Sequence, residues 1–214
     1  MSNTSESEHV IAENTYDLNV LAKKLRENEF EVKVFSTADA AVKSILQRCT
    51  GKSVGLADSA TIVRSGLLEA LKTKNNELLY AGNINRNRIT RRKAATADVF
   101  ILSANGISYE TGEIVNVDSK GNRIAGSLFN PEEVIFIIGK NKIAPNLDGA
   151  IHRARNIVAP RNAKEHNYDT PCVATGKCED CSHSDRICRV TCIFHKKPKL
   201  VNVMVVLIDE NLGW

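Results

Sequence analysis

The sequence VIFIIGKNK, at residues 134–142, joins a continuous apolar run to a short polar turn. A run of this kind, apolar on both faces, is typical of a strand that helices cover from both sides in a parallel sheet. The turn Gly139–Lys142 follows directly, where open α/β sheets place their ligand crevice. The segment therefore predicts both a fold class and the position of a site.

Strand-like and helix-like segments alternate on either side of this run. The other expected strands are Glu31–Phe35, Ser53–Gly55, Leu78–Ala81, Val99–Ser103, Glu113–Val117 and Val201–Ile208. Helical spacing relates Leu18, Leu21, Ala22 and Leu25; Ala38, Val42, Ile45 and Leu46; Ala60, Val63, Leu67 and Leu71; and Ala150, Ile151, Ala154, Ile157 and Val158. We expect Pro160 to stop the last helix. The alternation predicts a three-layer α/β protein with a mostly parallel sheet.

The composition suits one main domain. The chain has 214 residues, of which 43% are hydrophobic, enough for a proper core. We expect residues 1–13 to form a disordered tail and residues 14–214 to form the α/β domain, including a cysteine-rich segment at 160–198. The net charge of +4 is a mild excess and argues against a dedicated nucleic-acid binder.

Nothing in the sequence predicts export or membrane insertion. The N-terminal residues lack a basic region and an apolar run, and the apolar stretches elsewhere are far shorter than the roughly 20 residues that cross a bilayer. We therefore expect a cytoplasmic protein with no membrane partner. Because that compartment keeps thiols reduced, the cysteines are not expected to form disulfides.

A cluster of cysteines is the strongest chemical signal. Cys172, Cys178, Cys181, Cys188 and Cys192 follow the spacing C-x5-C-x2-C-x6-C-x3-C. Residues 160–198 show little apolar periodicity, so we expect an irregular segment that a bound metal orders. Pairing of Cys178/Cys181 with Cys188/Cys192 would suit zinc. The set Cys172, Cys178, Cys181 and Cys188 would equally hold an iron–sulfur cluster of the 4Fe–4S type, which we favour. His183 and His195 are alternative ligands, although loop histidines are more often solvated.

Polar loops after several expected strands suggest an anion-binding crevice. In the turn Gly55–Thr61, Gly55 would allow close backbone approach, and Ser59 or Thr61 would offer hydroxyl groups. A plain helix cap by Asp58 or Ser59 explains this turn equally well. The loops Asn116–Arg123 and Gly139–Lys142 follow other strands, and ordinary polar turns are the alternative for both. The same holds for Asn105, which closes a further strand.

The sequence also contains a short basic run, and it lacks the common catalytic and nucleotide-binding motifs. Arg86, Arg88, Arg91, Arg92 and Lys93 form a short cationic stretch, for which a solvated helix face is favoured over phosphate binding. No Ser/His/Asp triad, HExxH, Walker or dinucleotide-binding motif is present. The sequence therefore gives no support to a nucleophilic or nucleotide-driven mechanism.

Several stretches together resemble the LUD (lactate-utilisation) domain family in its short form with a cysteine-bearing C-terminus. They are GLADSAT (55–61), TADVFILSANGIS (96–108), GEIVNVDSKGNR (112–123), VIFIIGKNKI (134–143), APRNA (159–163), TPC-x5-C-x2-C (170–181), DRIC (185–188) and LIDENLG (207–213). The resemblance covers nearly all of the chain beyond the N-terminal tail.

The resemblance implies a fold similar to the ribose-phosphate isomerase, glucosamine-phosphate deaminase and CoA-transferase group. It implies a role in oxidation of lactate to pyruvate, beside iron–sulfur redox partners. The implied lining of the ligand crevice is Gly55, Asp58, Ser59, Asn105, Asn116, Asp118, Gly121, Asn122, Arg123 and Lys142. The implied metal ligands are Cys172, Cys178, Cys181 and Cys188. Cys192 lies outside this pattern.

Three functions remain open at this stage. The first is a redox-associated component of lactate utilisation that binds a small anionic metabolite. The second is an isomerase or transferase acting on a phosphorylated or acyl substrate, with Asp58, Asp118, Glu110 or Glu113 as acid or base and Lys142 or Arg123 holding the anion. The third is a non-catalytic sensor or subunit whose metal only folds the C-terminal segment.

Overall fold

The computed structural model describes residues 16–74, 77–80 and 88–214. The tail expected at 1–13, the end of the strand expected at Leu78–Ala81, and Arg86 of the basic run lie outside these residues. No helix in the described part of the chain is long and apolar enough to cross a membrane.

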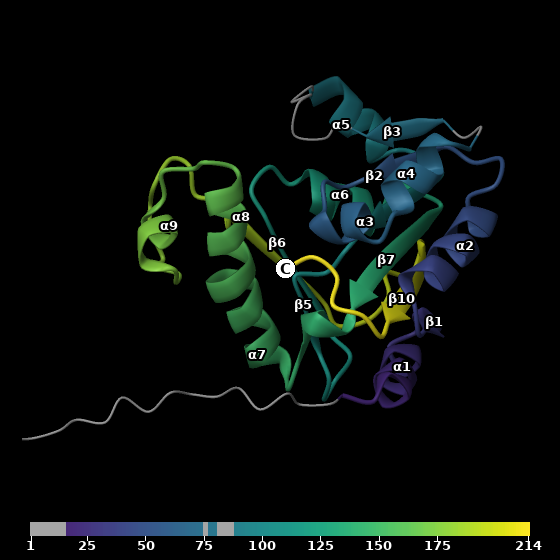
Figure 1. Cartoon of the computed structure of the whole chain (residues 1–214), viewed down its shortest axis with the longest axis horizontal. Helices are drawn as coiled ribbons and strands as arrows, with labels where there is room; N and C mark the ends of the chain where they lie inside the picture. The colour runs from purple at the N-terminus through teal and green to yellow at the C-terminus, as the bar shows by residue number, and fades with distance from the viewer. Residues whose placement is uncertain (1–15, 75–76, 81–87) are drawn as a thin grey trace, which may run out of the picture.

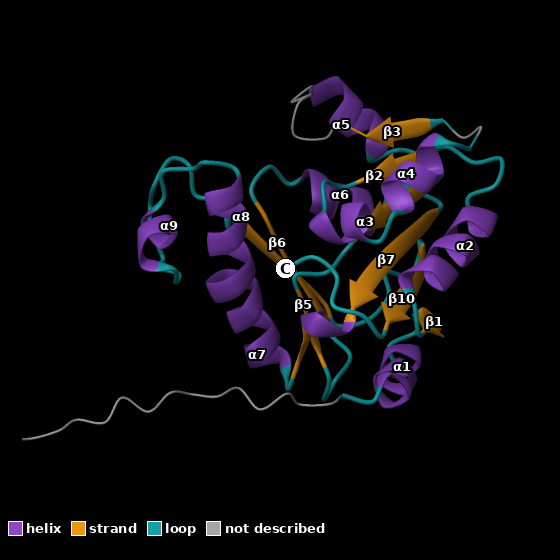
Figure 2. Cartoon of the chain, viewed as in Figure 1, coloured by secondary structure: helices purple, strands orange, loops and turns teal. Residues whose placement is uncertain are grey.

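A six-stranded, all-parallel sheet forms the centre of the protein (Figures 1 and 2). Its strands, in spatial order, are β1 (Glu31–Phe35), β10 (Asn202–Ile208), β7 (Glu133–Gly139), β4 (Val99–Leu102), β2 (Val54–Leu56) and β3 (Leu78–Tyr80). The two longest apolar runs of the sequence, β7 and β10, pair side by side in the middle of the sheet. The α/β class and the parallel sheet are thus confirmed.

Helices cover both faces of this sheet because its strands are apolar on both sides. One face packs against α2 (Ala38–Arg48), α3 (Ala60–Arg64) and α4 (Leu67–Lys72). The other face packs against α1 (Leu18–Glu27), the end of α5 (Arg88–Ala94) and α6 (Asn122–Leu128). The third expected helix is therefore wrong as one element: Gly66, at φ 78°, separates α3 from α4, and Val63 is 51% exposed.

A second, smaller sheet lies beside the first. It contains β8 (Ile143–Ala144), β5 (Gly106–Ser108), β6 (Ile114–Asp118) and β9 (Val190–Phe194), in that order, with antiparallel β5–β6 and β6–β9 pairs. The expectation that Glu113–Val117 joins the main sheet is wrong, because the short connection from β5 turns β6 back in an antiparallel hairpin. Three strands of this sheet are too short or too irregular in pattern to predict.

One long helical segment covers the outer face of the small sheet. It runs from α7 (Leu147–His152) through the π-helical η2 (Arg153–Val158) into α8 (Ala159–Glu165), as the column at the left of Figure 1 shows. The prediction that Pro160 stops this helix is wrong. In a regular α-helix, proline clashes with the carbonyl four residues earlier, but the wider π turn just before Pro160 changes that spacing and lets the helix continue.

The segment at 160–198 is more regular than expected. It contains the end of α8, the short helix α9 (Pro171–Thr175) and β9, which pairs with β6 over its whole length. The irregular part is therefore confined mainly to the loop between α9 and β9. The turn after β7 is a single 3-10 turn, η1 (Lys140–Lys142), at the predicted position.

Gly55 on β2 lets α5 approach the main sheet. A Cβ atom at this position would lie 1.9 Å from the carbonyl oxygen of Ala94. Backbone atoms cannot move aside as a flexible side chain can, so we expect Gly55→Ala to lower the free energy of unfolding by about 2 kcal/mol or more. Urea denaturation measures this loss.

Gly149→Ala on α7 is the matched control, because a Cβ there would meet its nearest atoms only at 3.2 Å. An equal loss of stability in the two variants would contradict the proposed clash.

Candidate functional site

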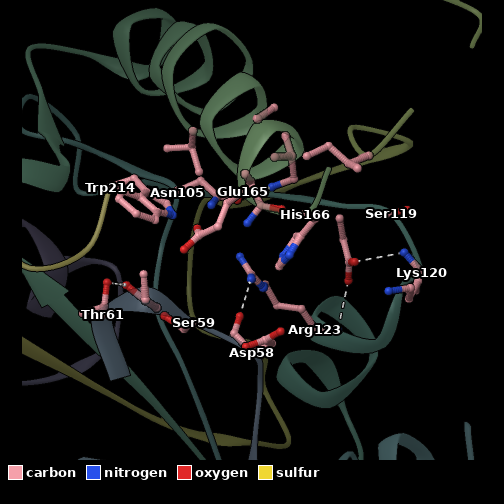
Figure 3. Close-up of a pocket in the computed structure, with 18 of the residues that line it drawn as sticks. Asp58, Ser59, Thr61, Asn105, Ser119, Lys120, Arg123, Glu165, His166 and Trp214 are labelled. Carbon is pink, nitrogen blue, oxygen red and sulfur yellow. Dashed lines mark hydrogen bonds between the residues drawn. The ribbon is translucent and has the colours of Figure 1, made fainter. Parts of the chain in front are cut away.

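A crevice of about 560 Å³ lies at the carboxyl ends of β2, β4 and β7. Its walls come from the loops after these strands and from α3, α5, α6, α8 and the last residue of the chain. The polar and aromatic lining residues are Asp58, Ser59, Thr61, Arg64, Tyr80, Arg91, Ser103, Asn105, Asp118, Ser119, Lys120, Asn122, Arg123, Lys142, Asn162, Glu165, His166, Asn167, Tyr168 and Trp214. Figure 3 shows Arg123 reaching toward the centre, with Asp58 on one side and Glu165 and His166 on the other.

Most of the predicted crevice residues lie on this lining. They are Asp58, Ser59, Asn105, Asp118, Asn122, Arg123 and Lys142. Gly55, Asn116 and Gly121 do not line it. Gly55 accommodates α5, Gly121 precedes α6 with a positive φ of 78°, and Asn116 is buried in the small sheet. The predicted set therefore contains residues that line the crevice and residues that support it from behind the lining.

Asp118 and Asp58 orient Arg123 across the crevice. The Asp118 carboxylate accepts hydrogen bonds from the backbone N–H groups of Arg123 (2.9 Å) and Ile124 (3.3 Å) at the start of α6. The Arg123 guanidinium donates to the backbone oxygen of Asp58 at 2.8 Å. The Asp58 carboxylate accepts from the Tyr80 hydroxyl at 3.2 Å, and burial together with this carboxylate raises the pKa of Tyr80 to about 12.

Asn105 and Asn116 join the crevice to the small sheet. The Asn105 side-chain oxygen accepts from the Val117 N–H at 2.7 Å, and the Asn105 N–H donates to the Asn116 side-chain oxygen at 3.1 Å. The buried guanidinium of Arg153 donates to the Asn105 carbonyl at 2.5 Å and to the Asn141 carbonyl at 3.0 Å. Asn105 therefore lines the crevice while its amide holds β6 in place.

Lys142 is the most unusual charged residue of the crevice because it is only 3% exposed. Burial lowers its pKa to about 6, and the nearby cations Arg153, Arg123 and Arg64 lower it further in the same direction. Its Nζ donates to the backbone oxygen of Trp214, and the Arg64 guanidinium stacks over the Trp214 ring at 4.3 Å. The crevice therefore combines a strong positive field with a buried amine.

Sequence reasoning missed one whole wall of the crevice. Asn162, Glu165 and His166 follow Val158 at helical spacing on one face of the continuous helix, but they were not considered because Pro160 was expected to end it. Trp214 and Arg64 gave no signal in the sequence. Within the basic run, Arg91 lines the crevice, whereas the other described members, Arg88, Arg92 and Lys93, are exposed.

Two proposed acid or base residues lie elsewhere. Glu110 is exposed, and neither Glu110 nor Glu113 lines the crevice. The Glu113 carboxylate instead contacts His195 and accepts from the Thr111 hydroxyl at 2.7 Å. Glu113 and His195 therefore contact each other at the edge of the small sheet, where they join the start of β6 to the end of β9.

The four predicted metal ligands line one small cavity. Cys172, Cys178, Cys181 and Cys188 surround it together with Arg155, Ala159, Thr170, Glu179, Arg186 and Ile187. Cys192 is not part of this lining: it lies on β9 opposite Asn116 and packs toward the main core. His183 and His195 do not line the cavity either, and Cys49 is fully buried next to α2.

Two arginines organise the loop that carries these cysteines. The Asp180 carboxylate accepts from Arg155 at 2.7 Å and from Arg186 at 2.9 Å. Arg186 also donates to the backbone oxygens of Cys181 (2.7 Å) and Cys188 (3.1 Å). Arg155 lies 3.6 Å from the Cys178 sulfur, and this sulfur raises the pKa of the guanidinium.

The chemistry of this donor set fits a thiolate-bound metal or cluster. The Arg155 guanidinium and the Asp180 N–H both donate to the Cys178 sulfur, and hydrogen bonds to sulfur are usual around iron–sulfur clusters. Within the described residues, no group of three or more His, Cys, Asp or Glu side chains is arranged so as to hold a metal ion. The four thiol groups therefore line one cavity, but they are not arranged as ligands of a single metal ion.

The cysteine cavity and the crevice share a wall. Ala159 on α8 and Ile187 in the cysteine loop line both of them. A backbone hydrogen bond of 3.1 Å also joins the Arg189 N–H to the carbonyl of Asp118, which lines the crevice. A change in the cysteine loop can therefore reach the crevice through direct contacts.

Comparison with known proteins identifies the family. The LUD domain family matches residues 18–208 of this chain. The chain belongs to the LUD domain family. The fold of this LUD-domain protein is similar to the crystal structure of a DUF162 family protein from Deinococcus radiodurans, with a TM-score of 0.52 and 14% sequence identity. That likeness covers 89% of this chain and 95% of the other. No curated protein matches the sequence.

Serine substitution tests the cysteine site of this LUD-domain protein. If these four cysteines hold a metal, as the sequence predicts, we expect Cys172→Ser, Cys178→Ser, Cys181→Ser and Cys188→Ser each to release it. The loop between α9 and β9 should then become sensitive to protease, because the metal would compensate the cost of ordering this loop. Metal analysis of anaerobically purified protein, followed by limited proteolysis, measures both effects.

Cys192→Ser and Cys49→Ser are the controls, since neither side chain lines the cavity. Loss of metal in Cys192→Ser, together with its retention in Cys172→Ser, would replace the ligand set with Cys178, Cys181, Cys188 and Cys192 and would favour zinc.

The buried amine of Lys142 predicts a pH dependence of stability. Its pKa is about 6 in the folded protein and about 10.4 in an unfolded chain, so the unfolded state binds more protons between these values. The free energy of unfolding should therefore rise as the pH increases from 6 to 10. We expect this rise to be smaller in Lys142→Met, as urea denaturation across this range would show.

Lys140→Met is the control, because Lys140 is half-exposed and pairs with Asp209 at 2.9 Å. If Lys142→Met kept the full slope of the unaltered protein, Lys142 would not be the buried amine with a lowered pKa that we describe.

Proposed function

We propose that this LUD-domain protein is a redox-associated component of lactate utilisation, the oxidation of lactate to pyruvate. In this proposal the crevice binds a small anionic metabolite, and the four cysteines hold an iron–sulfur cluster. The observation that carries it is the wall shared by the crevice and the cysteine cavity, formed by Ala159 and Ile187. A redox centre and a metabolite on the two sides of this wall would be close neighbours.

The charge of the crevice supports an anionic ligand. Arg64, Arg91, Arg123 and Lys142 reach it from four different elements, whereas Asp118 is engaged in capping α6. Arginine and lysine groups fixed in a half-enclosed site attract carboxylates more strongly than they would in water. A carboxylate held by Arg123 would also lie within the field of Arg64.

The cysteine cavity supports the metal part of the proposal. Cys172, Cys178, Cys181 and Cys188 would be the ligands, and Arg155 and Arg186 would hold the loop that carries three of them. A bound iron–sulfur cluster would supply one-electron transfer, and iron–sulfur proteins of a lactate-oxidising system would be its redox partners. Zinc on the same thiolates is the alternative, in which the site would only order the loop.

An isomerase or transferase remains the second candidate. Its main basis is the likeness to the sugar-phosphate isomerase and CoA-transferase group that the family resemblance implies. Of the acid or base residues first considered, Asp58 lines the crevice with its carboxylate accepting from Tyr80. Glu165 on α8 lies on the opposite wall and is a second carboxylate for such a reaction.

Trp214 is a built-in reporter for ligand binding, because it is the single tryptophan of the sequence and lines the crevice. We expect lactate or pyruvate to change its fluorescence. Arg123→Gln should weaken binding about tenfold, which corresponds to roughly 1.4 kcal/mol. Arg88→Gln, on the exposed side of α5, should leave the affinity unchanged.

The same titration tests the link between the sites. It should be repeated on protein reconstituted anaerobically with iron and sulfide and on metal-free protein. Different affinities in the two states, together with the visible absorption of an iron–sulfur protein, would support the redox proposal. A colourless protein with stoichiometric zinc, or equal affinities in both states, would contradict it and favour a metal that only stabilises the fold.

A further inference from the structure

Lys142 is a buried amine with which no Asp or Glu side chain of the described residues forms an ion pair. The ion pairs found there involve other lysines, arginines and His195. The charges that act on it come from Arg64 on α3, Arg123 on α6 and Arg153 on η2, and all three repel a protonated amine. Burial and like charges both favour the neutral form, which is the nucleophilic form of lysine.

The contacts of the Lys142 Nζ leave it able to react as a nucleophile. Its Nζ uses one N–H to donate to the backbone oxygen of Trp214, a contact that orients the side chain along the crevice wall. A neutral amine keeps a lone pair for a second partner. The low pKa of Lys142, about 6, is consistent with such a lone pair at neutral pH.

The neighbouring arginines determine which class of ligand can reach the Lys142 amine. Arg64 and Arg123 provide planar donor groups that suit a carboxylate, and both line the crevice with Lys142. A ligand that satisfies these arginines and reacts with a neutral amine needs a carboxylate beside an electrophilic carbon. The simplest compounds with both features are 2-oxo carboxylic acids.

We propose that Lys142 forms an imine with the keto group of a 2-oxo carboxylic acid bound in the crevice, an inference that rests on the anion-binding function proposed above. The Nζ lone pair attacks the keto carbon and forms the C–N bond. A proton then passes from nitrogen to oxygen and gives a carbinolamine. The second amine proton is transferred to its hydroxyl group, water leaves, and the C=N bond forms. No electrons are gained or lost, and hydrolysis returns the free amine and the acid.

Groups that can move these protons lie on the opposite wall. Glu165 at the end of α8 and His166 directly after it line the crevice, and Figure 3 shows both directed toward its centre. A carboxyl or imidazole group in this position can protonate the departing hydroxyl and later deprotonate the water that hydrolyses the imine. The crevice therefore holds an amine, an anion anchor and an acid–base pair together.

Reductive trapping tests this inference. The full-length protein would be incubated with pyruvate and cyanoborohydride, which reduces an imine to a stable secondary amine, and then digested for peptide mass analysis. We expect one adduct, located at Lys142, and at least tenfold less labelling of this peptide in Lys142→Arg and Lys142→Met. Lys140→Arg, which changes an exposed lysine on the same turn, should label as the unaltered protein does.

A neutral carbonyl compound tests imine formation at Lys142 separately from anion binding by Arg123. Acetaldehyde should label Lys142 equally in the unaltered protein and in Arg123→Gln, whereas pyruvate should label Arg123→Gln about tenfold less. If pyruvate changes Trp214 fluorescence but leaves no adduct at Lys142, the imine is overturned while the anion-binding function stands. If acetaldehyde labels Lys142 but pyruvate neither labels it nor changes the fluorescence, both the 2-oxo acid ligand and the anion-binding function fail.

Discussion

The pairing of β7 with β10 in the centre of the main sheet is the contact on which the site depends. Parallel strands end at the same edge, so the chains that leave β7 and β10 continue side by side. Lys140 donates its N–H to the Glu210 carbonyl at 3.1 Å, and the Asn141 side chain accepts from the Leu212 N–H at 3.0 Å. Gly139 permits this close approach, because a Cβ there would lie 2.6 Å from the Glu210 oxygen. Further along the same segment, the backbone oxygen of Trp214 accepts a hydrogen bond from the Lys142 Nζ at the crevice.

The small sheet and the long helix build the second half of the site. Arg153 on η2 donates to carbonyls on the two segments that leave β4 and β7, so the helix is fixed against both. From this position α8 presents one face to the crevice, and Ala159 reaches both the crevice and the cysteine cavity. The π-helical turn matters here because it allows the helix to continue past Pro160 and supply this wall.

Removing a cation from water costs free energy, and the protein offsets this cost differently for Arg153, Arg123 and Lys142. Arg153 is satisfied by two backbone carbonyls, and Arg123 donates to the Asp58 carbonyl near the charges of Asp58 and Asp118. Lys142 has only one backbone oxygen, and its pKa falls instead. An anion bound in such a site, as we propose, would supply negative charge beside Arg123 and Arg64.

The sequence by itself determined the parallel sheet, the strand ends that carry Asp58, Asn105 and Lys142, and the grouping of four cysteines on one short segment. These features depend on local apolar runs, turns and spacing, which are readable along the chain. Only the tertiary structure decided the strand order, the second sheet, the continuation of the helix past Pro160, and the arrival of Trp214 beside Lys142. The physical reason is that these contacts join residues far apart in sequence, or depend on a local helix geometry that residue type does not specify.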